Sequence, residues 1–102
     1  MVTGAVTQTT ASNTPTIASA ATAIAANAGR LGWSIQNTGQ NPLFVLLGTG
    51  ATTGIFHVVL KASTGNDDGT GGLISQTLGA VYTGKITIAG SSPRYVALEM
   101  AP

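Results

Sequence analysis

Few residues of this chain have side chains that can do acid–base or metal chemistry. Its 102 residues include one histidine, three acidic residues and no cysteine. The histidine, His57, lies between Phe56 and Val58 in an apolar stretch, so we expect it to have a structural or interface role. A zinc site built on His57 would have to draw its other ligands from the three acids. The sequence therefore predicts no metal site.

The spacing of these residues does not support any common catalytic arrangement. No serine has the nucleophile-elbow spacing that would accompany a serine–histidine–aspartate triad. Paired-carboxylate hydrolysis needs two acids that flank one site, whereas Glu99 is far in sequence from Asp67 and Asp68. The glycine-rich stretch 65–72 lacks the Lys-Ser/Thr of a P-loop and matches no dinucleotide fingerprint. We therefore predict that the chain is not an enzyme, has no catalytic residues and binds no cofactor.

The two aspartates stand side by side after Asn66 in this glycine-rich stretch. Oxygen ligands on a loop can hold calcium, but the spacing does not match an EF-hand, and we favour a solvated turn. Adjacent acids at a loop tip can also pair with a basic patch on another protein. Asp67 and Asp68 are therefore candidate partner contacts.

The basic and aromatic residues do not predict a groove for nucleic acid. The four basic residues are scattered and the formal net charge is +1, which gives no footprint for nucleic acid or for an anionic membrane. Trp33 has the same phase as Leu31 and Ile35, which favours packing in the core. Tyr82 and Tyr95 are expected at the edge of the core, with hydroxyl groups that reach solvent.

The composition is that of a folded chain with an unusually uncharged surface. Only 7% of its residues are charged, whereas ordinary domains have about 25%. Clustered isoleucine, valine and leucine indicate a folded core, and the length fits one domain. A surface wetted by threonine, serine and amides, with a net charge near zero, promotes association. We therefore expect a homo-oligomeric subunit of an assembly.

The N-terminal segment of the chain is polar. Residues 1–15 are rich in threonine, with Val2 and Val6 as their only large apolar aliphatic residues. We expect an extended N-terminal arm that a neighbouring subunit holds, so Val2 and Val6 are candidate partner contacts. Thr16–Ala26 fits either a helical face or a strand face, and the β pattern around it favours a strand.

Two apolar segments then predict a hairpin. Leu31–Gln36 alternates apolar and polar residues, Leu43–Leu47 is apolar on both faces, and residues 37–42 between them are typical of a turn. The second face of Leu43–Leu47 needs cover from another sheet, a loop or another subunit. Phe44 and Leu46 are therefore candidate partner contacts.

The rest of the chain predicts three more strands and one long loop. Ile55–Leu60 is the first of these strands, and alternating segments around Ile86 and Val96 are the other two. A long polar loop is expected at about 63–80. The predicted fold class is all-β: a single small β-sandwich or jelly-roll-like domain over residues 16–102, with the extended N-terminal arm.

Three short motifs give a resemblance to known proteins. Ala25–Arg30 has the pattern A-A-N-x-x-R, Ile35–Gly39 has I-Q-N-x-G before a strand that ends at Gly48, and Tyr82–Ile86 has Y-T-G-x-I. Over roughly residues 16–62 and 81–99, the chain resembles small virion proteins of tailed bacteriophages. The resemblance implies a β-structured particle component, of a kind that includes proteins that decorate or cement capsids. The segment 63–79 is long for this pattern.

The motif residues also have a physical interpretation as scaffold. Asn27 can bond its own backbone, and Asn37 and Gly39 can fix the turn. Arg30 can brace a loop or meet a carboxylate of another protein, which makes Arg30 a candidate partner contact as well.

The resemblance leads to a cement protein that stabilises a tailed-phage head as the first hypothesis. Its partner would be the major capsid protein, and it would bind between capsid subunits as a homo-oligomer, with a trimer favoured. Its location would be the capsid surface of the virion, after assembly in the host cytoplasm, with no nucleic-acid or membrane partner. The alternative is a tail or fibre module that binds a host-surface glycan through Tyr82, Tyr95 or the Asp67–Asp68 loop.

Overall fold

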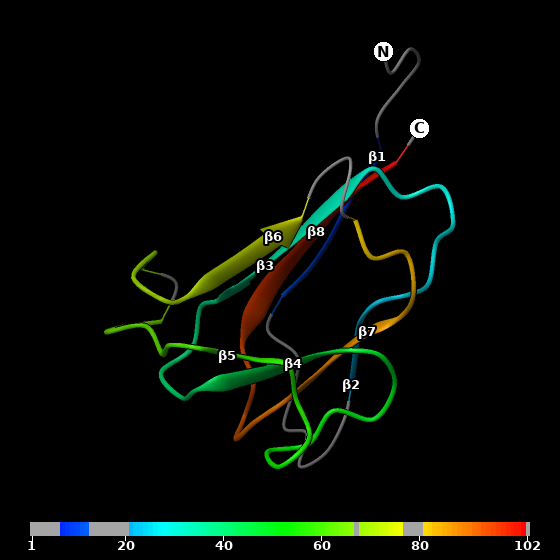
Figure 1. Ribbon diagram of the computed structural model, residues 1–102. Coiled ribbons are helices and arrows are strands. Elements are labelled where there is room, and N and C mark those ends of the chain that lie inside the picture. The colour runs from blue at the N-terminus through cyan, green and yellow to red at the C-terminus, as the bar shows by residue number, and fades with distance from the viewer. Residues whose placement is uncertain (1–6, 13–20, 67, 77–80, 102) are drawn as a thin grey trace.

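The computed structural model describes residues 7–12, 21–66, 68–76 and 81–101. These residues form eight strands and no helix, and no helix long and apolar enough to cross a membrane occurs among them (Figure 1). The strands are β1 (Thr7–Ser12), β2 (Ala21–Ile24), β3 (Gly32–Asn37), β4 (Leu43–Leu47), β5 (Val58–Leu60), β6 (Leu73–Gln76), β7 (Ile86–Ala89) and β8 (Tyr95–Ala101). The predicted all-β fold is confirmed.

The strands form two four-stranded antiparallel sheets. One has the order β1-β8-β3-β6 and is called the β3 sheet below. The other has the order β2-β7-β4-β5 and is called the β4 sheet. The two sheets enclose one hydrophobic core, as expected for a small β-sandwich.

The predicted hairpin between β3 and β4 is wrong, because the two strands lie in different sheets. Residues 38–42 cross from one sheet to the other instead of turning back within one. The alternation itself is confirmed, since Trp33 and Ile35 of β3 and Leu43 and Val45 of β4 are all buried. Because the two sheets face each other, these two apolar rows enter the same core from opposite sides.

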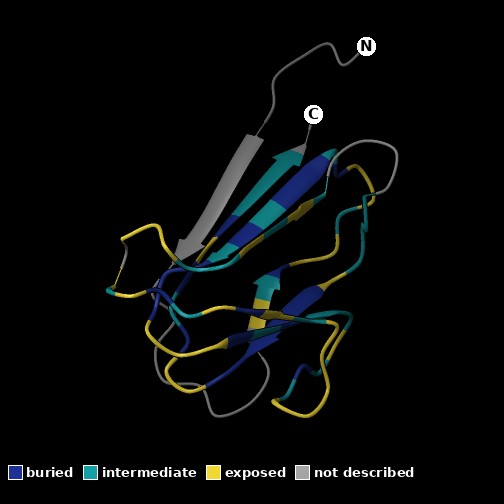
Figure 2. Ribbon diagram, turned by 60° about the vertical axis from the view of Figure 1, so that its left-hand side comes forward, coloured by how far each residue is buried: buried dark blue, intermediate teal, exposed yellow. Residues whose placement is uncertain are grey.

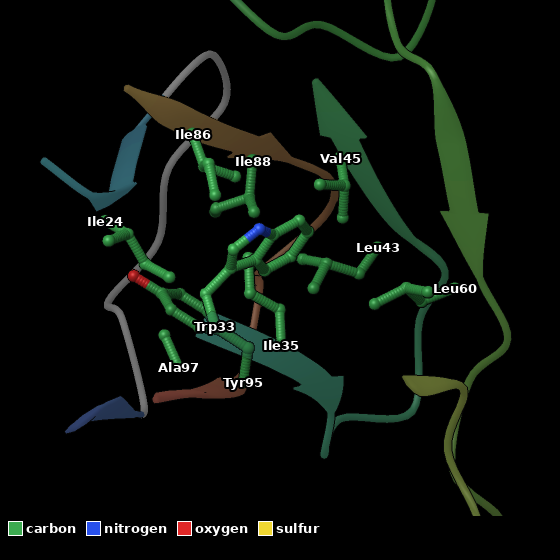
Figure 3. Packing of buried hydrophobic residues seen from close by; sticks show 10 residues of the cluster. All are labelled: Ile24, Trp33, Ile35, Leu43, Val45, Leu60, Ile86, Ile88, Tyr95 and Ala97. Atoms are coloured by element: carbon green, nitrogen blue, oxygen red, sulfur yellow. The ribbon is translucent and has the colours of Figure 1, made fainter. Parts of the chain in front are cut away.

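Trp33 lies at the centre of this core, as the sequence predicts (Figure 3). Tyr95, which we expected at the core edge, is only 2% exposed and packs inside the same cluster. Its position follows from the alternation of β8, in which Tyr95 and Ala97 are buried and Val96 is exposed. Buried residues follow the facing strands, and exposed residues gather on the connecting loops (Figure 2).

The N-terminal strands differ in how well the sequence predicts them. The strand expected within Thr16–Ala26 is confirmed for Ala21–Ile24, and residues 16–20 lie outside the described residues. Six residues of the expected arm form β1, which pairs with β8 of its own chain. The described part of the arm is therefore the edge strand of the β3 sheet. Val2 and Val6 lie outside the described residues.

The expected long loop at 63–80 contains a strand that the sequence analysis missed. β6 pairs with β3, with Ile74 opposite Ile35, and Ile74 packs against the core. Just before β6, a Cβ on Gly71 would overlap the carbonyl oxygen of Asn37 and lie 2.6 Å from Ser63 Oγ. This close approach of two backbones is possible only because residue 71 has no side chain.

Replacing Gly71 by alanine should therefore destabilise the fold by about 2–3 kcal/mol, since the added methyl group forces two backbones apart. Gly54→Ala is the matched control, because the nearest atom to its added Cβ is 3.9 Å away. Urea unfolding measures both variants. Equal stabilities for Gly71→Ala and Gly54→Ala would contradict the packing described here.

Candidate functional site

Arg30 is buried and uses its whole guanidinium inside the chain. Its Nε forms an ion pair with Glu99 Oε2 at 2.8 Å. Nη1 donates to the carbonyl oxygens of Tyr82 and Gly84, and Nη2 donates to that of Ala25 at 2.6 Å. Of the two roles predicted for Arg30, bracing is the one observed. The expectation of a contact to a partner's carboxylate is wrong, because the side chain has no exposed surface.

Asn27 completes this network at the backbone level. Its Oδ1 accepts a hydrogen bond from Gly29 N at 3.0 Å, as the sequence predicts for this residue. Its own N–H donates to the carbonyl oxygen of Thr83 at 2.8 Å, and its carbonyl accepts from Arg30 N. The A-A-N-x-x-R and Y-T-G-x-I motifs, which lie more than 50 residues apart in sequence, are therefore held against each other.

Asn37 has a similar role at the other end of β3. Its Nδ2 donates to the carbonyl oxygens of Asn41 at 2.8 Å and Leu60 at 3.1 Å. Its Oδ1 accepts from Gly39 N at 2.9 Å. The prediction that Asn37 and Gly39 fix a turn is confirmed, although this turn joins two sheets. Asn37 is buried, so it stabilises the scaffold and does not form a contact surface.

The Asp68 carboxylate is occupied within its own loop. Thr64 Oγ1 donates to Asp68 Oδ2, and both the N–H and the hydroxyl of Thr70 donate to Asp68 Oδ1. These hydrogen bonds, that from Thr64 first, hold the pKa of Asp68 well below its usual range. Asp67 lies outside the described residues, and the described residues contain no group of three metal-ligating side chains.

His57 is hydrogen-bonded to the last part of β4. Its Nδ1 accepts a hydrogen bond from Leu47 N at 3.1 Å, and its own N–H donates to the carbonyl oxygen of Val45 at 2.8 Å. The strand predicted at Ile55–Leu60 is shorter than expected, because β5 begins only at Val58. His57 therefore lies just before the strand and not within it.

A loop covers part of the outer face of the β4 sheet. The start of the connection between β4 and β5 lies against β7, where Thr87 Oγ1 donates to the carbonyl oxygen of Gly48 and accepts from Ala51 N. Ala51 and Thr87 are buried in consequence. Of the three kinds of cover expected for the second face of β4, a loop is the one observed over this half.

The other half of this face remains apolar and open to solvent. The rings of Phe44 and Phe56 pack with centroids 5.0 Å apart, yet Phe56 is 39% exposed. Val59, which is opposite Phe44 in the sheet register, is 44% exposed, and Ile55 is 58% exposed. We call Phe44, Phe56 and Val59 the outer apolar patch. Leu46, the other candidate on β4, is half-buried opposite Thr87.

The sequence pattern marks Phe44 as a contact candidate but does not mark Phe56 or Val59. They lie in the stretch expected to be one continuous strand, in which exposure cannot be assigned from an unbroken apolar run. The bridge between Thr52 and Ile55 turns the chain before β5, so the apolar run does not form one continuous strand. Only the tertiary structure therefore shows which of these apolar side chains are exposed.

Tyr82, Tyr95 and Asp68 are the alternative glycan contacts that lie among the described residues. Tyr95 is buried, so it cannot stack on a sugar. Tyr82 is half-buried, and its ring lies so close to Gly84 that a Cβ there would be 2.5 Å from its Cζ. Asp68 is occupied by Thr64 and Thr70, as described above.

The chain matches no protein-family model, and neither a curated protein nor a solved structure is significantly similar to it.

The buried arrangement around Arg30 predicts a large effect on stability. Arg30→Ala should lower the free energy of unfolding by about 3 kcal/mol or more, because it leaves Glu99 and three carbonyl groups without their donor. Lys85→Ala, at an exposed cation, should change it by less than about 0.5 kcal/mol. Urea unfolding compares the two. A small effect of Arg30→Ala would show that the bracing described here is not needed for the fold.

The Asp68 loop predicts a pH dependence. Because the hydrogen bonds to Asp68 hold its folded-state pKa below the ordinary aspartate value of about 4, the carboxylate stabilises the loop above about pH 4. That contribution is lost as the pH falls through the lowered pKa. The amide NMR shift of Thr70 should therefore stay constant from neutral pH to about pH 4 and move only in stronger acid. Asp68→Asn should remove this transition, and an ordinary aspartate midpoint in the parent chain would refute the loop geometry.

Proposed function

We propose that this chain is a structural virion protein, a capsid cement or decoration protein that stabilises a tailed-phage head. It would bind between subunits of the major capsid protein on the capsid surface. The observation that carries the proposal is the outer apolar patch, in which Phe56 and Val59 adjoin Phe44 and are exposed, because exposed apolar patches mark interaction sites. The motif resemblance supports the choice of partner.

The position of the patch suits a preformed contact surface. Phe44 lies on β4, which is hydrogen-bonded on both sides by β7 and β5, so its backbone is fixed before binding. A rigid surface loses little conformational entropy on association. Aromatic residues are enriched in the cores of protein interfaces, and the Phe44–Phe56 pair would provide this part.

A small patch fits cementing because a shell repeats the same contact many times. Modest affinity for each subunit adds up when linked copies bind a repeating lattice. The near-neutral surface does not repel a second copy or a shell, since the formal net charge is only +1. The expectations of a homo-oligomer and of a virion location are part of this proposal. So is the absence of an enzymatic, cofactor-binding or metal-binding role.

The tail or fibre module that binds a glycan is not proposed further. Tyr95, one of its alternative contacts, is buried, and no observation on Tyr82 or Asp68 favours a sugar site.

The copy number of the protein in purified particles tests the proposed function. Quantitative mass spectrometry should find it at a ratio comparable with the major capsid protein. A small ratio would point to a tail, neck or fibre component, and absence from the particle would refute a virion role.

The patch itself is tested by binding of variants to particles that lack the protein. The double variant Phe56→Ser, Val59→Thr should weaken binding by roughly tenfold or more, since it removes exposed apolar contact area. Leu73→Ser is the matched control, because Leu73 is 61% exposed but lies on β6 of the other sheet. Sedimentation with particles measures both. Equal binding of the double variant and the parent chain would refute the patch as the contact surface.

A further inference from the structure

Asp68 and Gly69 form a pair that the geometry of their loop favours. The carboxylate of Asp68 reaches over one residue and accepts a hydrogen bond from Thr70 N at 3.0 Å, as in an Asx turn. Gly69, between them, has a φ of +81°, a conformation that residues with a side chain rarely adopt. The turn is therefore best built by an aspartate followed directly by a glycine.

Among aspartate dipeptides, this one also rearranges most readily. The backbone nitrogen of the glycine attacks the side-chain carboxyl carbon, the nitrogen gives up its proton, the carboxyl group gives up a hydroxyl, and water leaves as a succinimide ring closes. Water then opens the ring at either carbonyl, and opening at the backbone carbonyl gives isoaspartate. Gly69 has no side chain to hinder the attack. Both residues are exposed to solvent, so water reaches the ring.

Both oxygens of the Asp68 carboxylate are held by donors in the same loop. Oδ2 accepts from Thr64 Oγ1, and Oδ1 accepts from the N–H and the hydroxyl of Thr70. The two threonines are themselves joined, because Thr64 N donates to Thr70 Oγ1 at 2.8 Å. We call these hydrogen bonds the threonine clamp. Whichever oxygen leaves as water must first lose its donor, so ring closure requires that the clamp opens.

The clamp also keeps the Asp68 carboxyl group in its less reactive form. A neutral carboxyl group can release water when a nitrogen attacks it, whereas an ionised carboxylate is a much poorer electrophile. The hydrogen bonds from Thr64 and Thr70 hold the pKa of Asp68 well below its usual range. Near neutral pH, the neutral form is therefore rarer at Asp68 than at an ordinary aspartate.

We propose that Asp68–Gly69 is a site of spontaneous isoaspartate formation and that the threonine clamp suppresses this reaction in the folded chain. The rearrangement would add one carbon to the backbone at this point and leave a shorter carboxylate attached to Cα. The clamp could then not re-form with the same geometry, so the change would be permanent for the loop. This inference concerns the covalent durability of the loop and does not depend on the proposed virion function.

Ageing of the purified chain at physiological temperature and mildly acidic pH tests the proposal. Peptide mapping with fragmentation separates the two isomers of equal mass and locates isoaspartate at residue 68. Thr64→Val removes the donor to Oδ2 and keeps the size of the side chain. It should raise the rate of isoaspartate formation roughly threefold to tenfold, since a lost hydrogen bond raises the pKa of a carboxyl group.

Thr53→Val is the matched control, because Thr53 is also exposed but lies outside this loop, and it should age like the parent chain. Urea unfolding first establishes that both variants are folded. Equal rates of isoaspartate formation in Thr64→Val and the parent chain would overturn the proposal.

A comparison of the folded and the unfolded parent chain needs no substitution. In denaturant the clamp is absent, so isoaspartate should form at Asp68 at least about tenfold faster than in the folded chain under otherwise equal conditions. Similar rates in the two states would overturn the suppression by the clamp. An absence of isoaspartate at Asp68 in the unfolded chain would overturn the site itself.

Discussion

The buried guanidinium of Arg30 is the constraint on which the rest of the structure depends. A buried charge is unfavourable by several kcal/mol unless a counter-ion and hydrogen-bond acceptors surround it. Glu99 of β8 supplies the counter-ion from the β3 sheet, while Ala25 and Gly84 supply acceptors beside β2 and β7 of the β4 sheet. Satisfying one side chain therefore fixes how the two sheets meet. Asn37 does the same at the opposite end of β3, so polar contacts close both ends of the apolar core.

Local patterns predicted those features that depend on local physics. The alternation of Leu31–Gln36 placed Trp33 and Ile35 in the core, and the turn chemistry of Asn37 was correct. The crossing between sheets was not predictable, because residues 37–42 suit a turn within one sheet equally well. β6 was missed because Leu73–Gln76 acquires its strand conformation from β3, a partner far away in sequence.

The candidate site was predicted only where a single strand defines it. Phe44 was identified from the two-sided apolar pattern of β4, whereas Phe56 becomes its neighbour through a loop that folds back across the sheet. Conversely, a surface contact was one of the two roles expected for Arg30, because nothing local shows that the distant carbonyl groups of Tyr82 and Gly84 accept hydrogen bonds from it. Sequence patterns show which side chains are apolar or charged, but the return path of the chain decides which of them remain exposed.

The pairing of the first strand with the last has a mechanical consequence. Thr7 is opposite Ala101, so the two ends of the described chain leave the sandwich at the same corner (Figure 1). A force that pulls these ends apart breaks the hydrogen bonds between β1 and β8 one after another. Because only one or two bonds carry the load at a time, the resistance is low. A force that separates the two sheets must instead disrupt the core packing and the polar contacts of Arg30 and Asn37 together. The domain should therefore yield easily at its termini and resist load through its body.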